Sequence, residues 1–218
     1  MTNALRQAPL PVDLDRLLHD LRGPLNAAVL HLQALKRLVG DDDAAQVSLQ
    51  SIQKELDRLT AMLPVAFAVG ALEMGPRRRV LLRSIVESAT DAAMRKRVRV
   101  EESAWPEVDG DERLLVLAMQ QLLANALEAS SEDGEVRVAV EPGERGIVAI
   151  VVRDAGKGFP TRNPNAAVRL MAGTKPGHLG IGLLVAQRIA RLHGGALTVE
   201  TAPEGGGIVR FAVAALPA

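Results

Sequence analysis

His19 is the residue of this sequence best suited to do chemistry, and it lies in the segment Leu18–Leu25. Imidazole is the side chain that titrates near neutral pH, so it can exchange a proton or act as a nucleophile. Asp20 follows directly and can orient the ring or accept a proton from it. Pro24 stands where a proline inside a helix removes a main-chain hydrogen bond and clashes with the carbonyl of Asp20. We therefore expect a reactive histidine on a locally loosened helix.

A second group of polar side chains lies on a predicted helix near the middle of the chain. Gln121, Asn125 and Glu128 follow one another at spacings of four and three, so they share one face of an otherwise apolar helix. A buried helix tolerates such a stripe where it lines something polar, and carboxamide and carboxylate oxygens suit Mg²⁺ and its waters. The alternative interpretation is that the stripe simply faces solvent.

Asp154 ends an apolar run and begins the segment Asp-Ala-Gly-Lys-Gly. A carboxylate there can accept a hydrogen bond from the exocyclic amine of adenine, whereas guanine presents an acceptor at the same edge. Gly156 and Gly158 permit positive φ and a close approach of a ligand. An ordinary turn is the other interpretation of these five residues.

Three further glycines, Gly177, Gly180 and Gly182, precede the next predicted helix. A glycine-rich loop before a helix N-terminus offers free main-chain amides and a positive dipole end to phosphate groups. No Gly-Lys-Ser/Thr follows, so this is not a Walker loop. Lys175 and Arg169 lie just before the helix and are interpreted either as phosphate contacts or as solvated surface residues.

Two helices must position His19. Their apolar residues recur at alternating spacings of four and three, which is a heptad pattern. The first helix is expected over 12–39 and the second over about 45–66, joined by a short acidic turn at Asp41–Asp43; the apolar positions are Leu14, Leu18, Leu21, Leu25, Ala28, Leu32, Leu35 and Val39, then Ala45, Leu49, Ile52, Leu56, Leu59, Leu63 and Ala66. His19 falls outside the apolar face. The pair predicts an antiparallel hairpin, and its uncovered apolar face predicts a homodimer with a four-helix bundle.

The organisation of the chain follows from where this pattern ends. Residues 1–12 form a tail, 13–74 the helical domain and 75–218 a second domain, because the heptad pattern breaks around 70–79. We interpret residues 70–79 as a linker and hinge, in which Arg77–Arg79 are solvated. The second domain is expected to contain a short segment at 80–82, helices at 83–96, 112–130 and 183–192, and strands at 97–101, 135–140, 147–153, 196–201 and 208–214. Adjacent strands with grouped helices indicate an α+β sandwich, with Asp111 as a helix cap and His193 as a structural residue.

Composition excludes several classes of function. Lysine plus arginine and aspartate plus glutamate both number 26, so a net charge of zero argues against general binding of nucleic acid or of a membrane surface. With no cysteine, the chain has neither disulfides nor thiolate metal ligands, which fits a cytoplasmic location. No apolar run approaches the roughly 18 residues that a transmembrane helix needs, so no membrane insertion is expected.

Four segments in one order resemble the transmitter core of sensor histidine kinases. "HDLRGPL" is similar to the family's H box, "QQLLANALEAS" to its N box, "DAGKG" to its G1 box and "GHLGIGLLVAQRIARLHGG" to its G2 box. The resemblance covers residues 13–217. It implies a dimerisation and phosphoacceptor hairpin at 13–74 and a catalytic ATP-binding domain of Bergerat type at 75–218.

The resemblance also implies a mechanism. His19 would be phosphorylated from ATP and would pass the phosphoryl group to an aspartate of a response-regulator receiver domain, with Asp20 as the acid/base neighbour. Input would come from a separate sensor protein. The residues implied to bind ATP are Asn125, Asp154, Gly156, Gly158, Gly180 and Gly182, with Asn125 and Gln121 holding Mg²⁺. Lys175 is added to the ATP-binding residues from its place just before the glycine-rich loop.

The chain departs from the family pattern at several positions. Gly23 stands where the family has a Thr or Asn that helps to position water for dephosphorylation of the partner, so phosphatase activity is not predicted for this chain. Gln121 replaces the first asparagine of the N box. The F box is replaced by the segment 168–171, so a compact lid is expected over 160–179. These departures leave an alternative, a histidine phosphotransferase or adaptor whose second domain binds no nucleotide. An ATPase of the gyrase or chaperone type would have no need of the hairpin.

Overall fold

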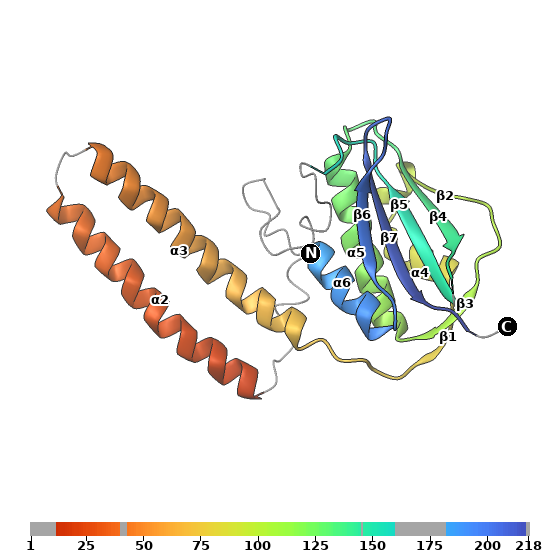
Figure 1. Ribbon diagram of the computed structural model, residues 1–218, viewed down its shortest axis with the longest axis horizontal. Coiled ribbons are helices and arrows are strands. Elements are labelled where there is room, and N and C mark those ends of the chain that lie inside the picture. Colours follow the sequence, from red (N-terminus) through yellow and green to blue (C-terminus); the bar gives the residue numbers. More distant parts are fainter. Residues whose placement is uncertain (1–11, 40–42, 145, 160–181, 217–218) are drawn as a thin grey trace. The chain divides into compact units, whose positions relative to one another are not determined.

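The computed structural model describes residues 12–39, 43–144, 146–159 and 182–216 (Figure 1). The chain divides into two compact units, Met1–Ala71 and Leu72–Ala218, and each is described by itself. Within the described residues, none of the helices combines the length and the apolar character that crossing a bilayer demands.

The first unit is the predicted helical hairpin. Helix α2 spans Val12–Leu38 and helix α3 spans Asp43–Gly70, and the two lie side by side. Leu32 and Leu49 of the heptad pattern are buried, whereas Leu35 and Ile52 of the same pattern are about half exposed, at 48% and 50%. The hairpin therefore covers only part of its apolar surface.

The second unit is built on a five-stranded mixed sheet. Its elements are β1 (Arg78–Leu81), α4 (Leu82–Ala89), a 3₁₀ turn (Met94–Lys96), β2 (Val98–Val100), β3 (Glu107–Gly110), α5 (Glu112–Ala129), β4 (Val136–Pro142), β5 (Ile147–Arg153), α6 (Gly182–Leu192), β6 (Leu197–Thr201) and β7 (Gly207–Ala214). The strand order is β2-β4-β5-β7-β6, with only the β2–β4 pair parallel, and β1 pairs with β3 in a separate antiparallel ribbon. This arrangement confirms the predicted α+β fold class.

Helices α5 and α6 pack against the sheet, and α4 packs against α5 (Figure 1). The face of the sheet beneath them is apolar, and Ile150 on β5 and Phe211 on β7 are fully buried. Asp111 caps α5, because its Oδ1 accepts the N–H of Leu114 at 3.3 Å. The packing between the sheet and the helices therefore positions α5 and α6 relative to each other and to the strands.

Three features of the second unit differ from the sequence predictions. The helix predicted over 83–96 ends at Ala89, because Thr90 adopts an extended conformation and donates its Oγ1 hydrogen to Val86 O at 2.6 Å. Strand β3 was not predicted. The arginines interpreted as a solvated linker belong to the fold, since Arg78 and Arg79 lie in β1 and Arg77 pairs with Asp109 at 3.2 Å.

Candidate functional site

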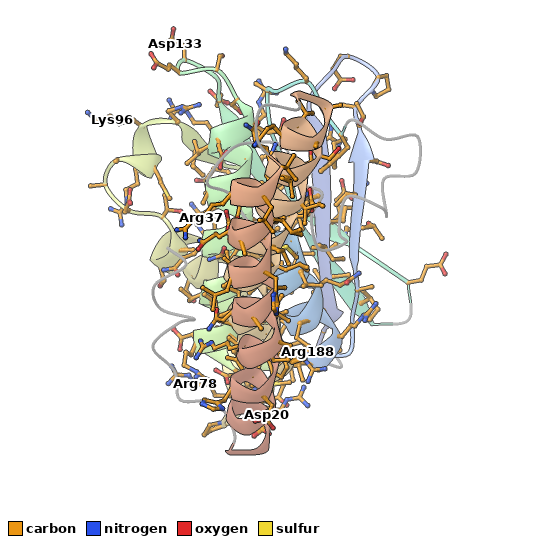
Figure 2. The ribbon with its side chains drawn as sticks, turned by 90° about the vertical axis from the view of Figure 1, so that its left-hand side faces the viewer. Asp20, Arg37, Arg78, Lys96, Asp133 and Arg188 are labelled. Atoms are coloured by element: carbon orange, nitrogen blue, oxygen red, sulfur yellow. The ribbon has the colours of Figure 1, made fainter. Side chains whose placement is uncertain are left out.

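His19 and Asp20 lie on α2, and both side chains face solvent. The imidazole is 85% exposed and the Asp20 carboxylate 68% exposed, with His19 Nδ1 3.6 Å from Asp20 Oδ1 (Figure 2 labels Asp20). This distance is just beyond a direct hydrogen bond. The structure therefore presents the imidazole to an incoming reactant and keeps a carboxylate within a small side-chain movement of the ring.

Asp154 follows β5 and is held by main-chain groups. Its Oδ1 accepts the N–H of Gly156 at 2.8 Å and the N–H of Gly207 at 2.9 Å. Both hydrogen bonds that the described residues donate to this carboxylate go to the same oxygen. Oδ2 therefore keeps its acceptor capacity for a donor such as an exocyclic amine, in an orientation that the main chain sets.

The turn between β6 and β7 holds the glycine segment in place. Gly206 has φ of +88°, and a Cβ there would lie 2.2 Å from the carbonyl oxygen of Asp154, so only glycine fits. Thr201 Oγ1 accepts the N–H of Phe159 at 2.9 Å. Phe159 follows Gly158, whose φ is +74°. Thr201 and Gly206 were not predicted as supporting residues; the signal available in the sequence was the glycine triplet 205–207 between two predicted strands.

The end of α5 touches the other side of the same segment. Ala155 donates its N–H to Ser130 Oγ at 3.1 Å, and a Cβ on Gly156 would lie 2.5 Å from the carbonyl oxygen of Ala129. Gly156 is therefore required for close packing rather than for an unusual backbone angle. The glycine segment is fixed between a helix end and a strand turn.

Asn125 lies against the beginning of α6. A Cβ on Gly182 would be 2.6 Å from Asn125 Nδ2, so the glycine allows the amide to sit beside the first turn of that helix. Asn125 and Glu128 are exposed and Gln121 is half-buried. The structure thus brings Asn125 and Gly182 together, while Asp154, Gly156 and Gly158 form a second cluster beside Ala129 and Ser130, at the same carboxyl end of α5.

Several predicted site residues lie outside the described residues. These are Lys175, Gly180, Arg169, Gly177 and the segment 168–171, together with the rest of the predicted lid. Their roles remain predictions.

His193 is buried at the end of α6 and is 2% exposed. Its Nδ1 lies 2.8 Å from the carbonyl oxygen of Ile189, so Nδ1 carries the hydrogen and Nε2 accepts the N–H of Asp111 at 3.0 Å. Burial lowers the pKa of His193, because a charged imidazolium would lose its hydration. A neutral, fully hydrogen-bonded imidazole is what the structural interpretation of this residue requires.

The donor set fits a nucleotide with a hard cation. Asn125 offers a carboxamide oxygen next to the amino end of α6, and Asp154 offers an oriented carboxylate oxygen. Among the described side chains, no group of three His, Asp or Glu residues is arranged to hold a metal ion. A cation at Asn125 would therefore need the phosphate groups of the nucleotide as further ligands.

Comparisons with known proteins agree with this arrangement. Residues 110–217 match the family model "Histidine kinase-, DNA gyrase B-, and HSP90-like ATPase". The chain is 28% identical over 205 residues to the sensor histidine kinase ZraS of Klebsiella oxytoca, covering 88% of this chain and 43% of that protein. It is 26% identical over 219 residues to the adaptive-response sensory kinase SasA of Crocosphaera subtropica, covering 91% of this chain and 57% of that protein. The chain spans about half the length of these relatives.

Solved structures share the fold. The mycobacterial sensor histidine kinase MprB gives a TM-score of 0.56 at 24% identity, over 65% of this chain and 99% of that chain. Full-length ShkA in complex with AMPPNP gives 0.60 at 22% identity, over 96% of this chain and 47% of that chain.

Proposed function

This chain is a histidine kinase transmitter core with an ATP-binding domain of the GHKL type, and we propose from this premise that it phosphorylates His19 from ATP. The phosphoryl group then passes to an aspartate of a response-regulator receiver domain. The observation that supports this most directly is the combination, in one chain, of a solvent-facing histidine on a helical hairpin and a nucleotide-type donor set at Asn125 and Asp154.

Each residue of the proposed site has one task. Asp154 Oδ2 accepts a hydrogen bond from the exocyclic amine of adenine, and the glycines next to Asp154 let the base approach. Main-chain amides at the start of α6 bind phosphate oxygens. Mg²⁺, bound by Asn125 and the phosphates, would neutralise charge between the transferring phosphates. An imidazole nitrogen of His19 attacks the γ-phosphorus as the bond from that phosphorus to the β,γ-bridging oxygen breaks and ADP leaves, while Asp20 accepts or orients the proton on the other ring nitrogen. Catalysis is then chiefly a matter of positioning.

The partners follow from the hairpin. Half-exposed leucine and isoleucine side chains in the heptad pattern support a homodimer through a four-helix bundle. The exposed imidazole supports delivery to a receiver domain, because an acceptor carboxylate can approach it directly from solvent.

Labelling with γ-³²P-ATP and Mg²⁺ tests the proposal. We expect wild-type protein to acquire an acid-labile, alkali-stable label, because phosphohistidine has this stability. The His19→Gln variant should bind ATP normally and acquire no label. His31→Gln is the matched control, since His31 is an exposed histidine of the same helix.

The outcomes separate the two candidate functions. Label that persists in His19→Gln would remove His19 from its role. Absence of both labelling and ATP binding in the wild type would favour a phosphotransfer or adaptor protein, to which the Gln121 departure also points.

A further inference from the structure

Two buried polar residues of the second unit have no part in the proposed chemistry. Asp111 is 4% exposed and His193 is 2% exposed, and they touch at the amino end of α5 and the carboxyl end of α6. Burying such groups is costly unless every polar atom is paired. The hydrogen-bond partners of Asp111 and His193 therefore indicate their structural role.

His193 fixes the peptide between Gly110 and Asp111. The ring accepts the Asp111 N–H at Nε2, and a Cβ on Gly110 would lie 2.8 Å from the ring carbon Cδ2. The imidazole thus packs directly on the main chain, and glycine at position 110 makes room for it. This contact sets the position from which the Asp111 side chain starts.

Asp111 uses its two oxygens for two different segments. Oδ1 accepts the N–H of Leu114 in the first turn of α5, and Oδ2 accepts the N–H of Gly75 at 2.8 Å. A Cβ on Gly75 would lie 2.7 Å from Oδ2, so any larger residue there would displace either the carboxylate or the linker, residues 72–77. Burial alone would raise the pKa of Asp111, but the two N–H groups and the Arg113 guanidinium outweigh it and hold the pKa low.

Neighbouring contacts attach the same linker on both sides of Gly75. Arg188 of α6 donates from Nη2 to Leu72 O at 3.3 Å, and Arg77 donates from Nη2 to Asp109 O at 2.8 Å (Figure 2 labels Arg188). These two arginines are partly or largely exposed, whereas the bond between Gly75 and Asp111 ends on a buried carboxylate. The contact at Gly75 is therefore the one among these three that ends on a buried charged acceptor.

We propose that Asp111, oriented by His193, is a positioning residue for phosphoryl transfer, because it fastens the linker at Gly75 to the first turn of the helix that carries Asn125. The linker and the nucleotide-binding helix then move as one body, and the joint with the hairpin is confined to residues before Gly75. This inference rests on the proposed transfer of phosphate to His19. It corrects the sequence-based expectation that all of 70–79 acts as a hinge.

The test uses the full chain and separates the two roles of Asp111. In Asp111→Ser the shorter hydroxyl side chain still caps α5, but it no longer reaches Gly75. We expect the Gly75 amide, protected from hydrogen exchange in the wild type, to exchange rapidly in the variant. The rate constant kcat for His19 labelling should fall about tenfold or more, because small misplacement of reacting groups is costly. KM for ATP should stay within about twofold, since the nucleotide contacts are intact.

Two further variants protect this test. Gly75→Ala approaches the same bond from the linker side and should reproduce the fall in kcat with Asp111 unchanged. Asp91→Ser makes the same change at an exposed position, where the carboxylate accepts the N–H of Met94, and it should behave as wild type.

Each result decides the proposal. A protected Gly75 amide in Asp111→Ser, an unchanged kcat in Asp111→Ser and Gly75→Ala, or a rise in KM alone would overturn it. If the wild type fails to label His19, the proposed function fails and this positioning role fails with it. Hydrogen exchange at Gly75 would then still show whether the linker is fastened, so the two failures are distinguishable.

Discussion

The carboxylate of Asp154 is held through one oxygen by two main-chain N–H groups, and this gives its second oxygen a fixed direction. The type of residue and its place after an apolar strand could be predicted from the sequence. The orienting partners could not, because Gly207 lies 53 residues further along the chain and meets Asp154 only once β5 and β7 pair. Local patterns therefore indicate the candidate binding residue, whereas non-local strand pairing supplies the groups that orient it.

Replacing Asp154 with asparagine should change which base is bound. The main-chain donors hold Oδ1, so the amide NH₂ of Asp154→Asn would face the adenine amine as a second donor. We expect ATP affinity to fall about 100-fold, because buried donors would be left unpaired, and the preference for ATP over GTP to shrink. Competition of ATP and GTP against a fluorescent nucleotide measures both. Asp133→Asn, in an exposed turn, is the control, and an unchanged ATP-to-GTP ratio would contradict the assignment.

Among the elements, those with a sustained period were predicted best. The heptad pattern identified α2 and α3, and the apolar run with its Asp111 cap identified α5. The prediction of one helix over 83–96 was wrong because Thr90 is buried and extended, which ends α4 at Ala89. Asp91 then accepts the N–H of Met94, and a separate turn begins there. Strand β3 was missed because four residues are too few to show a period, and its pairing with β1 is non-local.

The β6–β7 hairpin supports the glycine segment that follows β5, and a substitution at Thr201 tests this support. Thr201→Val keeps the shape of the side chain but removes the acceptor of the Phe159 N–H. Because this hydrogen bond is exposed, we expect only about a fivefold rise in KM for ATP, equivalent to about 1 kcal/mol, with kcat little changed. Thr201→Ser retains the hydroxyl and should restore the wild-type KM. A KM that is the same in all three proteins would show that this hairpin does not position the segment.

For the whole molecule, the buried imidazole of His193 links stability to pH. Burial lowers its pKa below the ordinary value, while nearby Asp109 and Asp111 oppose this shift and Arg77 supports it. The unfolded chain therefore binds the proton more readily than the folded chain. The free energy of unfolding should fall as pH drops below about 6.5, by at most about 1.4 kcal/mol per pH unit, and it should level off once the pH is below the folded pKa. Above that range this contribution is complete.

Trp105 offers a convenient measurement of this effect, because it is buried in the ATP-binding unit and is the only tryptophan of the sequence. Urea unfolding followed by its fluorescence between pH 5 and pH 8 should show the predicted slope. In His193→Gln, which keeps an acceptor but does not titrate, the slope should largely disappear. The same slope in both proteins would assign it to other groups; the Asp111 carboxylate, with its lowered pKa, titrates at lower pH.

The apolar surface of the hairpin makes an association of two chains the expected state of the whole molecule. Leu35 and Ile52 follow the same heptad pattern as the buried Leu32 and Leu49, yet they stay about half exposed in one chain. A lysine at Leu35 would place a charge in the bundle of the proposed dimer, at a cost of several kcal/mol. Sedimentation velocity should therefore show a dimer for the wild type and a monomer for Leu35→Lys. Gln33→Lys adds the same charge at an exposed position outside the pattern, and it should remain dimeric. If Leu35→Lys also remained dimeric, association would have to use another surface.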